Sequence, residues 1–362
     1  MKKAFSIFML ILFLGSYSWA QSSDKIQEAK VCFENYVKTL KSGDEEKTKE
    51  YWNKEEKERY KFYDWQLRDM IFRKINLQGL DYKIEKIEDK DQYSKMNVEW
   101  YYPEERSKVI QKDTRYFILE NGKMVGANPI FVLTKDWVKK ESKHFVYHFK
   151  TNKHKPDQKL LDKMDNFYEK IVSFLKVDYQ DRIDYFRCDS ATEVGMLFNM
   201  EGSLAQCDII NGVAAGIRDF VPHEVVHIIS LKILPPEEKR LPERYLDEGL
   251  AYYLGGSTFF SSDLLLSWAK TKILKDPNVS LNSLVQKTEK YQGNEGAALM
   301  SSLVKFLIEN YGLDKFKRLY SLGKTYPMDP NSDDRRKETL ESIYGEKMDV
   351  LEVKWKNFVL SL

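Results

Sequence analysis

The spacing of hydrophobic and polar positions predicts a small α+β domain at the start of the chain. Hydrophobic residues recur at helical spacing over 23–42, and the highly charged stretch over 45–74 predicts further helix. Alternation with a period of two follows over 82–87, 93–101, 114–119 and 124–132, which predicts strands. The Asn121-Gly122 pair predicts a tight hairpin turn between the last two strands. Together these elements predict one domain over residues 21–138.

The remaining residues, 139–362, have the pattern of a second and more helical domain. A strand over 144–149, a helix over 156–175 and a strand over 183–188 come first. The segment from Pro222 is then apolar on nearly every face until Pro235-Pro236 stops it, which predicts a buried helix. Asp219 is placed to cap this helix, and a proline in the first turn is tolerated there. A second apolar helix is expected over 241–254.

Residues 1–20 are expected to be a signal peptide and not part of the fold. Lys2 and Lys3 precede an apolar run over 4–14, and Ser18-Trp19-Ala20 fits a small-x-small cleavage site. The run is too short to span a membrane comfortably. The sequence therefore predicts an exported protein, periplasmic or secreted, that begins at Gln21 and has no stable membrane insertion after cleavage.

The charge balance narrows the class of partner. Removing residues 1–20 removes two of the 58 basic residues and none of the 56 acidic ones, so the net charge becomes 56 − 56 = 0. Interspersed charges with no net excess argue against a binder of nucleic acid or anionic membranes. The three cysteines add one expectation. Cys188 and Cys207 are predicted to form a disulfide in an oxidising compartment, whereas Cys32 is expected in the core of the first domain.

The predicted helix from Pro222 carries the most specific chemistry, His223-Glu224-Val225-Val226-His227. Positions i and i+4 lie on one helix face, so His223 and His227 can bind one metal ion, and Glu224 can reach a water bound to it. Two imidazoles with an open position describe a catalytic zinc site. The pattern arises by chance in roughly one chain of this length in a hundred. The chain has only five histidines, however, and polar groups in a buried helix need partners.

The third ligand must be a carboxylate, because no histidine follows His227. A metzincin would have Gly and His where this chain has Ser230 and Ile233. The helix expected over 241–254 carries two adjacent acids, Asp247 and Glu248. Spacing alone does not choose between them, because neighbours on a helix point about 100° apart.

His-Glu-x-x-His followed by Leu-Pro-x-aromatic-Leu-x-Glu-Gly-x-Ala-x-Tyr resembles the gluzincin zinc peptidases, specifically the peptidase MA-like family related to the M1 aminopeptidases. The resemblance covers roughly residues 140–362 and implies a zincin-like fold, with a small mixed sheet and a helical lobe. It implies that Glu248 is the zinc ligand, and it departs from the family at Tyr245, where tryptophan is common. By element order, the first domain resembles the NTF2-like fold, and an unrelated small α+β domain is the alternative.

The resemblance also implies a substrate-binding strand just before the zinc helix, at Gly212, Val213, Ala214 and Ala215, which would pair with an extended peptide. The aminopeptidases carry there a glutamate that holds the substrate's free amine. This chain has no acid in the stretch, so an endopeptidase fits better. Tyr291 precedes the helix that the resemblance places over the site, and it is the candidate donor to the oxyanion. Its alternative is a surface tyrosine, one of 22.

These observations predict an exported metallopeptidase with one Zn²⁺ per chain, acting on a peptide or protein substrate. Glu224 is the expected general base, which accepts a proton from the attacking water. Two alternatives stay open. One is a zinc-binding interaction module with little or no activity, and the other is a zinc hydrolase of a non-peptide amide or ester.

Overall fold

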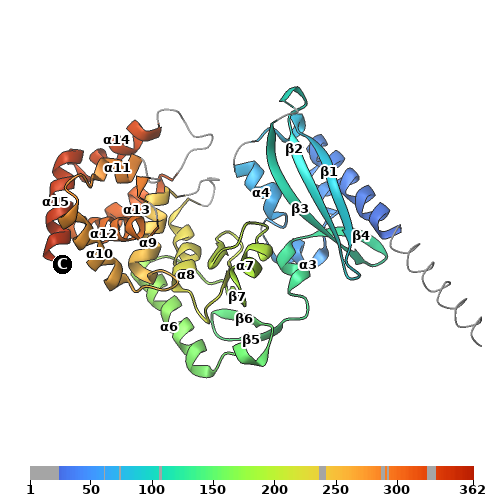
Figure 1. Ribbon diagram of the computed structural model, residues 1–362, viewed down its shortest axis with the longest axis horizontal. Coiled ribbons are helices and arrows are strands. Elements are labelled where there is room, and N and C mark those ends of the chain that lie inside the picture. Colours follow the sequence, from blue (N-terminus) through green and yellow to red (C-terminus); the bar gives the residue numbers. More distant parts are fainter. Residues whose placement is uncertain are drawn as a thin grey trace, which may run out of the picture. The chain divides into compact units, whose positions relative to one another are not determined.

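The structure, a computed structural model, describes residues 24–60, 62–72, 75–105, 108–235, 242–286, 290–291, 293–323 and 332–362 (Figure 1). The predicted signal peptide and its cleavage point lie outside the described residues. The fold is mixed α+β, and the chain divides into two compact units between Asp136 and Trp137, where the expected boundary was 138/139. Residues Met196–Met200 belong to the first unit, and Phe198 stacks on Trp65 with ring centroids 5.8 Å apart. The sequence had not indicated that a segment this late in the chain belongs to the first unit.

The first unit is a four-stranded antiparallel sheet with helices before it. Its strands are β1 (Asp81–Asp89), β2 (Ser94–Tyr101), β3 (Val109–Glu120) and β4 (Lys123–Ala127), in the order β1-β2-β3-β4. Asn121 and Gly122 both have positive φ, +51° and +77°, as the predicted hairpin turn requires. The helix over 24–42 contributes Phe33 to the core. The ring centroid of Phe33 lies 5.9 Å from that of Trp100.

Two expectations for the first unit were wrong in detail. The predicted helical stretch over 45–74 is divided into α2 (Glu45–Lys49), α3 (Lys54–Arg59) and α4 (Trp65–Phe72). Asn53 begins α3 by accepting from the backbone N–H of Glu56, so it caps a new helix instead of continuing the old one. The predicted strand over 124–132 ends at Ala127, and α5 (Pro129–Leu133) follows, because a proline cannot donate to a sheet. Short 3₁₀ turns occur at Leu77–Gly79 and Pro103–Glu105.

The second unit opens with a five-stranded mixed sheet. Its order is β5 (Val138–Glu141), β6 (Phe145–Phe149), β7 (Ile183–Arg187), β9 (Val213–Gly216) and β8 (Ala205–Asp208). Strands β6, β7 and β9 are parallel, whereas β5 and β8 are antiparallel to their neighbours at the two ends. Between β6 and β7 the chain forms a 3₁₀ turn at Asn152–His154 and α6 (Gln158–Leu175), and α7 (Ala191–Leu197) follows β7. The strand-helix-strand order matches the expectation.

The remainder of the second unit is helical within the described residues. The helices are α8 (Pro222–Ser230) with a 3₁₀ turn at Leu231–Ile233, α9 (Arg244–Gly255), α10 (Ser262–Lys275), α11 (Leu281–Gln286), α12 (Gly293–Tyr311), α13 (Leu313–Ser321), α14 (Ser332–Tyr344) and α15 (Met348–Ser361). One hydrophobic core joins them to the sheet. In the described part of the chain, no helix is both long and apolar enough to cross a membrane.

Two glycines allow α9 to lie between α8 and α12. A Cβ at Gly249 would lie 2.6 Å from Cγ2 of Val304 and 2.7 Å from the carbonyl oxygen of Met300, both on α12. A Cβ at Gly255 would lie 2.7 Å from the backbone nitrogen of His223, at the start of α8. Side chains at these positions would push the helices apart, so Gly255 sets the distance between α9 and α8, the two helices that carry the candidate ligands, and Gly249 sets the distance between α9 and α12.

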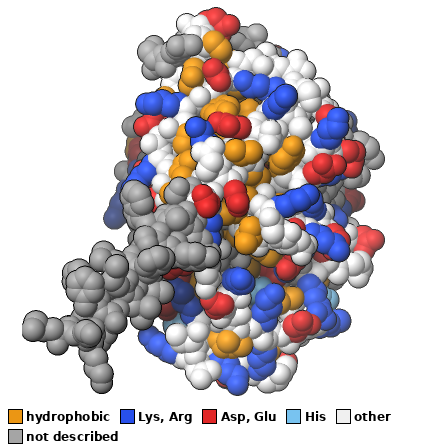
Figure 2. Space-filling view, turned by 90° about the vertical axis from the view of Figure 1, so that its right-hand side faces the viewer, with side chains coloured by type: hydrophobic (Ala, Val, Ile, Leu, Met, Phe, Trp, Pro, Cys, Tyr) orange, Lys and Arg blue, Asp and Glu red, His pale blue; other side chains and the backbone are white. Residues whose placement is uncertain are grey.

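One face of the molecule agrees with the charge balance of the sequence. On the face drawn in Figure 2, basic and acidic side chains are interspersed, with hydrophobic side chains between them. The described residues on this face therefore do not form a patch of one sign of charge, the kind of surface that attracts a polyanion.

Candidate metal centre

Helix α8 carries the His-Glu-x-x-His run, and Pro222 stands at its start as the sequence predicted. The cap was predicted wrongly. Val221 occupies the N-cap position without a side-chain hydrogen bond, and Asp219 instead accepts from Nε of Arg187 at 3.0 Å. Every residue from His223 to Ser230 is buried, so the helix presents its polar groups to the protein interior. Such groups must find partners inside the fold.

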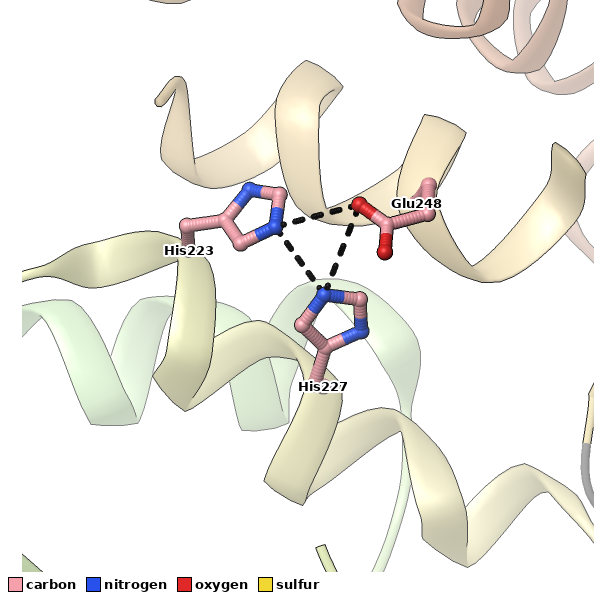
Figure 3. Close-up of side chains that lie close together, drawn as sticks. All are labelled: His223, His227 and Glu248. Carbon is pink, nitrogen blue, oxygen red and sulfur yellow. Dashed lines mark hydrogen bonds and ion pairs between the residues drawn. The ribbon is translucent and has the colours of Figure 1, made fainter. Parts of the chain in front are cut away.

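Three side chains from α8 and α9 converge on one point, as Figure 3 shows. Nε2 of His223 lies 3.0 Å from Nε2 of His227 and 3.4 Å from Oε2 of Glu248. Nε2 of His227 lies 4.0 Å from the same carboxylate oxygen. Ligands of a tetrahedral zinc, each about 2.0–2.2 Å from the metal, lie about 3.4 Å from one another. The donor set and its spacing therefore fit a zinc ion held by two imidazoles and one carboxylate.

The second nitrogen of each imidazole faces an acceptor, which leaves Nε2 directed at the common point. Nδ1 of His223 lies 2.9 Å from the carbonyl oxygen of Gly256, and Nδ1 of His227 lies 3.0 Å from Oδ2 of Asp247. Acceptors at Nδ1 favour the tautomer with its proton on that atom and a free electron pair on Nε2. Both imidazoles are thus prepared to bind a cation.

Electrostatics within the group are strong because the site is buried. Burial by itself would lower the pKa of His227, but the carboxylates of Asp247, Glu248 and Glu224 outweigh it and raise that pKa to about 10. Burial would raise the pKa of Glu248, but the hydrogen bond from His223 and the charges of His227, His223 and Arg244 lower it to about 2. The same negative charges that raise the pKa of His227 would also stabilise a bound cation.

Glu224 lies beside the three ligands without belonging to the group. It follows His223 directly on α8 and is only 8% exposed. Its carboxylate is a neighbour of Cys207 on β8. Burial, the charge of Glu224 and a hydrogen bond from the thiol to that carboxylate raise the pKa of Cys207 well above its usual range. A buried carboxylate next to a cation-binding point is placed to accept a proton from a water held there.

Tyr252 is a component of the site that the sequence reasoning missed. Its ring centroid lies 4.5 Å from that of His223. Burial, the charges of Glu248 and Glu224 and a hydrogen bond to Glu248 raise the pKa of its hydroxyl. Helical spacing could have found it, because Tyr252 follows Glu248 by four residues and therefore lies on the same face of α9.

Tyr291, the tyrosine chosen from the sequence, is placed elsewhere. Its side chain is 7% exposed and packs in the hydrophobic core of the second unit. Its hydroxyl accepts a hydrogen bond from the backbone nitrogen of Ser280 at 3.1 Å, so it is directed at a loop and not at the three ligands. The assignment of Tyr291 as oxyanion donor was wrong, and so was its alternative as a surface residue.

The predicted substrate-binding strand was also wrong. Val213, Ala214 and Ala215 lie in β9, which pairs with β7 on one side and β8 on the other, and Gly212 directly precedes it. A strand paired on both sides has no free N–H and C=O groups for a peptide. The end of the sheet is β8, Ala205–Asp208, and this strand packs against α8.

The predicted disulfide does not form, because Cys188 and Cys207 are both free thiols. Cys207 on β8 pairs with Ala214, whereas the backbone nitrogen of Cys188 donates to Gly216 on the other side of β9. Two strands that flank a third lie about 10 Å apart, beyond the roughly 7 Å that a disulfide spans between Cα atoms. Cys32 is buried in the first unit, as expected.

Comparison with known proteins adds no family to this picture. No protein-family model matches the chain, and no curated protein matches it.

Proposed function

We propose that this chain is a zinc-dependent metallopeptidase, with the metal held by His223, His227 and Glu248. The observation that carries the proposal is the convergence of these three side chains within 4.0 Å of one another, with Glu224 buried beside them. Two imidazoles, one carboxylate and an adjacent carboxylate base form the donor set of a hydrolytic zinc site. Structural zinc sites are instead closed by four protein ligands.

Bound zinc would supply a Lewis acid that lowers the pKa of a water toward neutrality. The residues of the chain then divide the remaining tasks. Glu224 accepts the proton of the attacking water and later delivers it to the leaving amine. The hydroxyl of Tyr252, beside Glu248, is the proposed donor to the oxyanion that develops on the substrate carbonyl. Tyr252 takes the role first assigned to Tyr291.

An extended peptide substrate is proposed to pair with β8. Among the described strands, β8 pairs only with β9, and it carries Cys207, whose thiol contacts the carboxylate of Glu224. Main-chain pairing along such an edge would align the substrate with the site through its backbone. This arrangement needs no free amino terminus, in keeping with an endopeptidase.

The wider assignments form part of the same proposal. The second unit is proposed to be a zincin-like domain of gluzincin type, similar to the peptidase MA-like family, and the first unit an NTF2-like domain. Residues 1–20 are proposed to direct export to a periplasmic or secreted location. The mixed sheet followed by helices, with an antiparallel strand at its end beside α8, supports the zincin-like assignment.

The test is to purify the chain from Gln21 to Leu362, measure its zinc content, and incubate it with a broad peptide library. The expected result is one zinc per chain, with cleavage that stops on chelation and returns with added Zn²⁺. Zinc without cleavage of any peptide would favour the interaction module or a hydrolase of non-peptide amides or esters. Chain that binds no zinc would contradict the proposal.

A further inference from the structure

Asp247 forms a bridge between the candidate metal centre and α13. Its Oδ2 lies 3.0 Å from Nδ1 of His227, and its Oδ1 accepts a hydrogen bond of 2.6 Å from the hydroxyl of Tyr320. Tyr320 is fully buried in the second unit. One carboxylate oxygen of Asp247 thus contacts the imidazole of His227, and the other accepts the hydrogen bond of Tyr320.

Ser230 adds a further hydroxyl to this bridge. It is fully buried, and its Oγ lies 2.9 Å from the hydroxyl oxygen of Tyr320 and 3.1 Å from the carbonyl oxygen of His227. The hydroxyl proton of Tyr320 is donated to Asp247. The single proton of Ser230 has two acceptors within reach, the carbonyl oxygen of His227 and the hydroxyl oxygen of Tyr320. Ser230 therefore packs its hydroxyl beside the bridge from Tyr320 to Asp247.

A metal at Nε2 of His227 requires the proton of that ring to reside on Nδ1, where the carboxylate of Asp247 must accept it. A carboxylate on a helix surface has rotational freedom about its side-chain bonds. The hydroxyl of Tyr320 restricts that freedom, because it holds Oδ1 while Oδ2 faces the imidazole. Tyr320 thus acts on the metal ligand without touching it.

We infer that Tyr320 is a positioning residue for metal binding, and that it couples the packing of α13 to occupation of the metal centre. The inference rests on the proposed zinc site. Two consequences follow. Loss of the Tyr320 hydroxyl weakens the affinity for zinc, and zinc protects the backbone amides of α13 from hydrogen exchange by holding Tyr320 in place.

Tyr320→Phe tests the first consequence, because phenylalanine removes only the hydroxyl. The ring remains, and with it the packing on Phe316, whose ring centroid lies 5.9 Å away. The matched control is Tyr311→Phe in the same unit, which also removes a hydrogen bond to a carboxylate, that of Glu346 at 3.2 Å. Zinc dissociation constants are measured on the full chain by competition with a chromophoric chelator. We expect a weakening of about tenfold for Tyr320→Phe and less than about twofold for Tyr311→Phe.

A double-mutant cycle separates positioning from general structural damage. Asp247→Asn keeps the shape of the side chain and should weaken zinc binding by about 10- to 100-fold. If Tyr320 acts through Asp247, adding Tyr320→Phe to Asp247→Asn causes little further loss, whereas independent structural damage would add in full. The cycle is read in zinc affinity, with the melting temperature of each metal-free variant measured alongside. Hydrogen exchange of α13 in the wild-type chain, with and without zinc, gives a second measurement that needs no variant.

The outcomes of these measurements are distinct. Wild-type chain that binds no zinc would contradict the proposed function itself. Wild-type chain that binds zinc while Tyr320→Phe binds it equally well would overturn this inference alone. So would additive losses in the cycle, or amides of α13 that exchange at the same rate with and without zinc.

Discussion

The carboxylate of Asp247 lies 3.0 Å from Nδ1 of His227, on the opposite side of the imidazole from the point where the three candidate ligands meet. Its neighbour in sequence, Glu248, faces Nε2 of the same ring at 4.0 Å. Two adjacent residues on a helix point about 100° apart, so the two carboxylates lie near different nitrogens of the His227 imidazole. Both acids therefore have a place in the site, one as a candidate ligand and the other as the group that orients a ligand.

Glu248→Gln is expected to weaken zinc binding by at least about 100-fold, because a neutral amide replaces the anionic ligand. Zinc retained after dialysis against a mild chelator gives the measurement. Glu309→Gln on α12 is the control, since Glu309 contacts Tyr253 and Lys305. Retention of one zinc by Glu248→Gln would leave Asp247 as the third ligand.

Glu224→Gln is expected to keep its zinc and lose cleavage by a factor of about 10³ or more, because glutamine cannot accept the proton of the attacking water. Initial rates on any peptide that the wild-type chain cleaves provide the measurement. Glu169→Gln on α6 is a suitable control, because Glu169 pairs with Lys143 and His144, which are not among the candidate ligands. Equal rates for Glu224→Gln and wild type would exclude Glu224 as the base.

Tyr252→Phe is expected to lower kcat by about 100-fold or more, with zinc content and KM nearly unchanged, because a transition-state donor is removed. Tyr253→Phe, the next residue on α9, is the control, since its hydroxyl contacts Glu309 at 3.4 Å. Loss of zinc from Tyr252→Phe would instead assign this hydroxyl to holding Glu248 in place.

All three thiols are expected to be free in the folded protein. Denaturation without a reducing agent, followed by alkylation, should therefore add three alkyl groups to each chain. Intact mass is the measurement. A single alkyl group per chain would indicate a disulfide and would contradict the strand order β7-β9-β8.

The stability of the first unit is expected to fall as the pH rises through about 7. Glu56 is fully buried, and burial raises its pKa to about 7, although hydrogen bonds from Asn128, Asn53 and Trp52 oppose the rise. The raised pKa means that the folded state favours the protonated carboxyl of Glu56. Protonation of Glu56 therefore contributes fully to the free energy of unfolding below about pH 4.5, and this contribution is lost as the pH rises through about 7. The shift from 4.5 to about 7 corresponds to roughly 3 kcal/mol.

The measurement is urea unfolding of the wild-type chain and of Glu56→Gln at pH 5 and pH 8. Glutamine does not ionise in this range, so the variant should lose most of the difference in stability between the two pH values. A wild-type chain equally stable at both, or a variant with an undiminished difference, would show that Glu56 is ionised throughout.

Short-range patterns in the sequence determined most of the secondary structure and the candidate ligands His223 and His227, and the family resemblance gave Glu248 as the third. The helix with His223 and His227, the hairpin at Asn121-Gly122 and the strand-helix-strand order over β6, α6 and β7 follow from helical spacing, turn chemistry and alternation, which act over a few residues. The adjacent acids on α9 were also visible in the sequence, but spacing did not show that Asp247 faces Nδ1 of His227.

Only the tertiary structure decided which segments meet. The order β7-β9-β8 makes β8 the end of the sheet and separates Cys188 from Cys207, and no local pattern specifies which of two strands takes the outer place. Likewise, the hydroxyl of Tyr320 donates to Asp247, which lies 73 residues away in the sequence. The hydroxyl of Tyr291 accepts from the backbone nitrogen of Ser280, and both contacts result from how the helices pack. Contacts between residues far apart in the sequence depend on how whole helices and strands pack, and the spacing of neighbouring residues does not specify that packing.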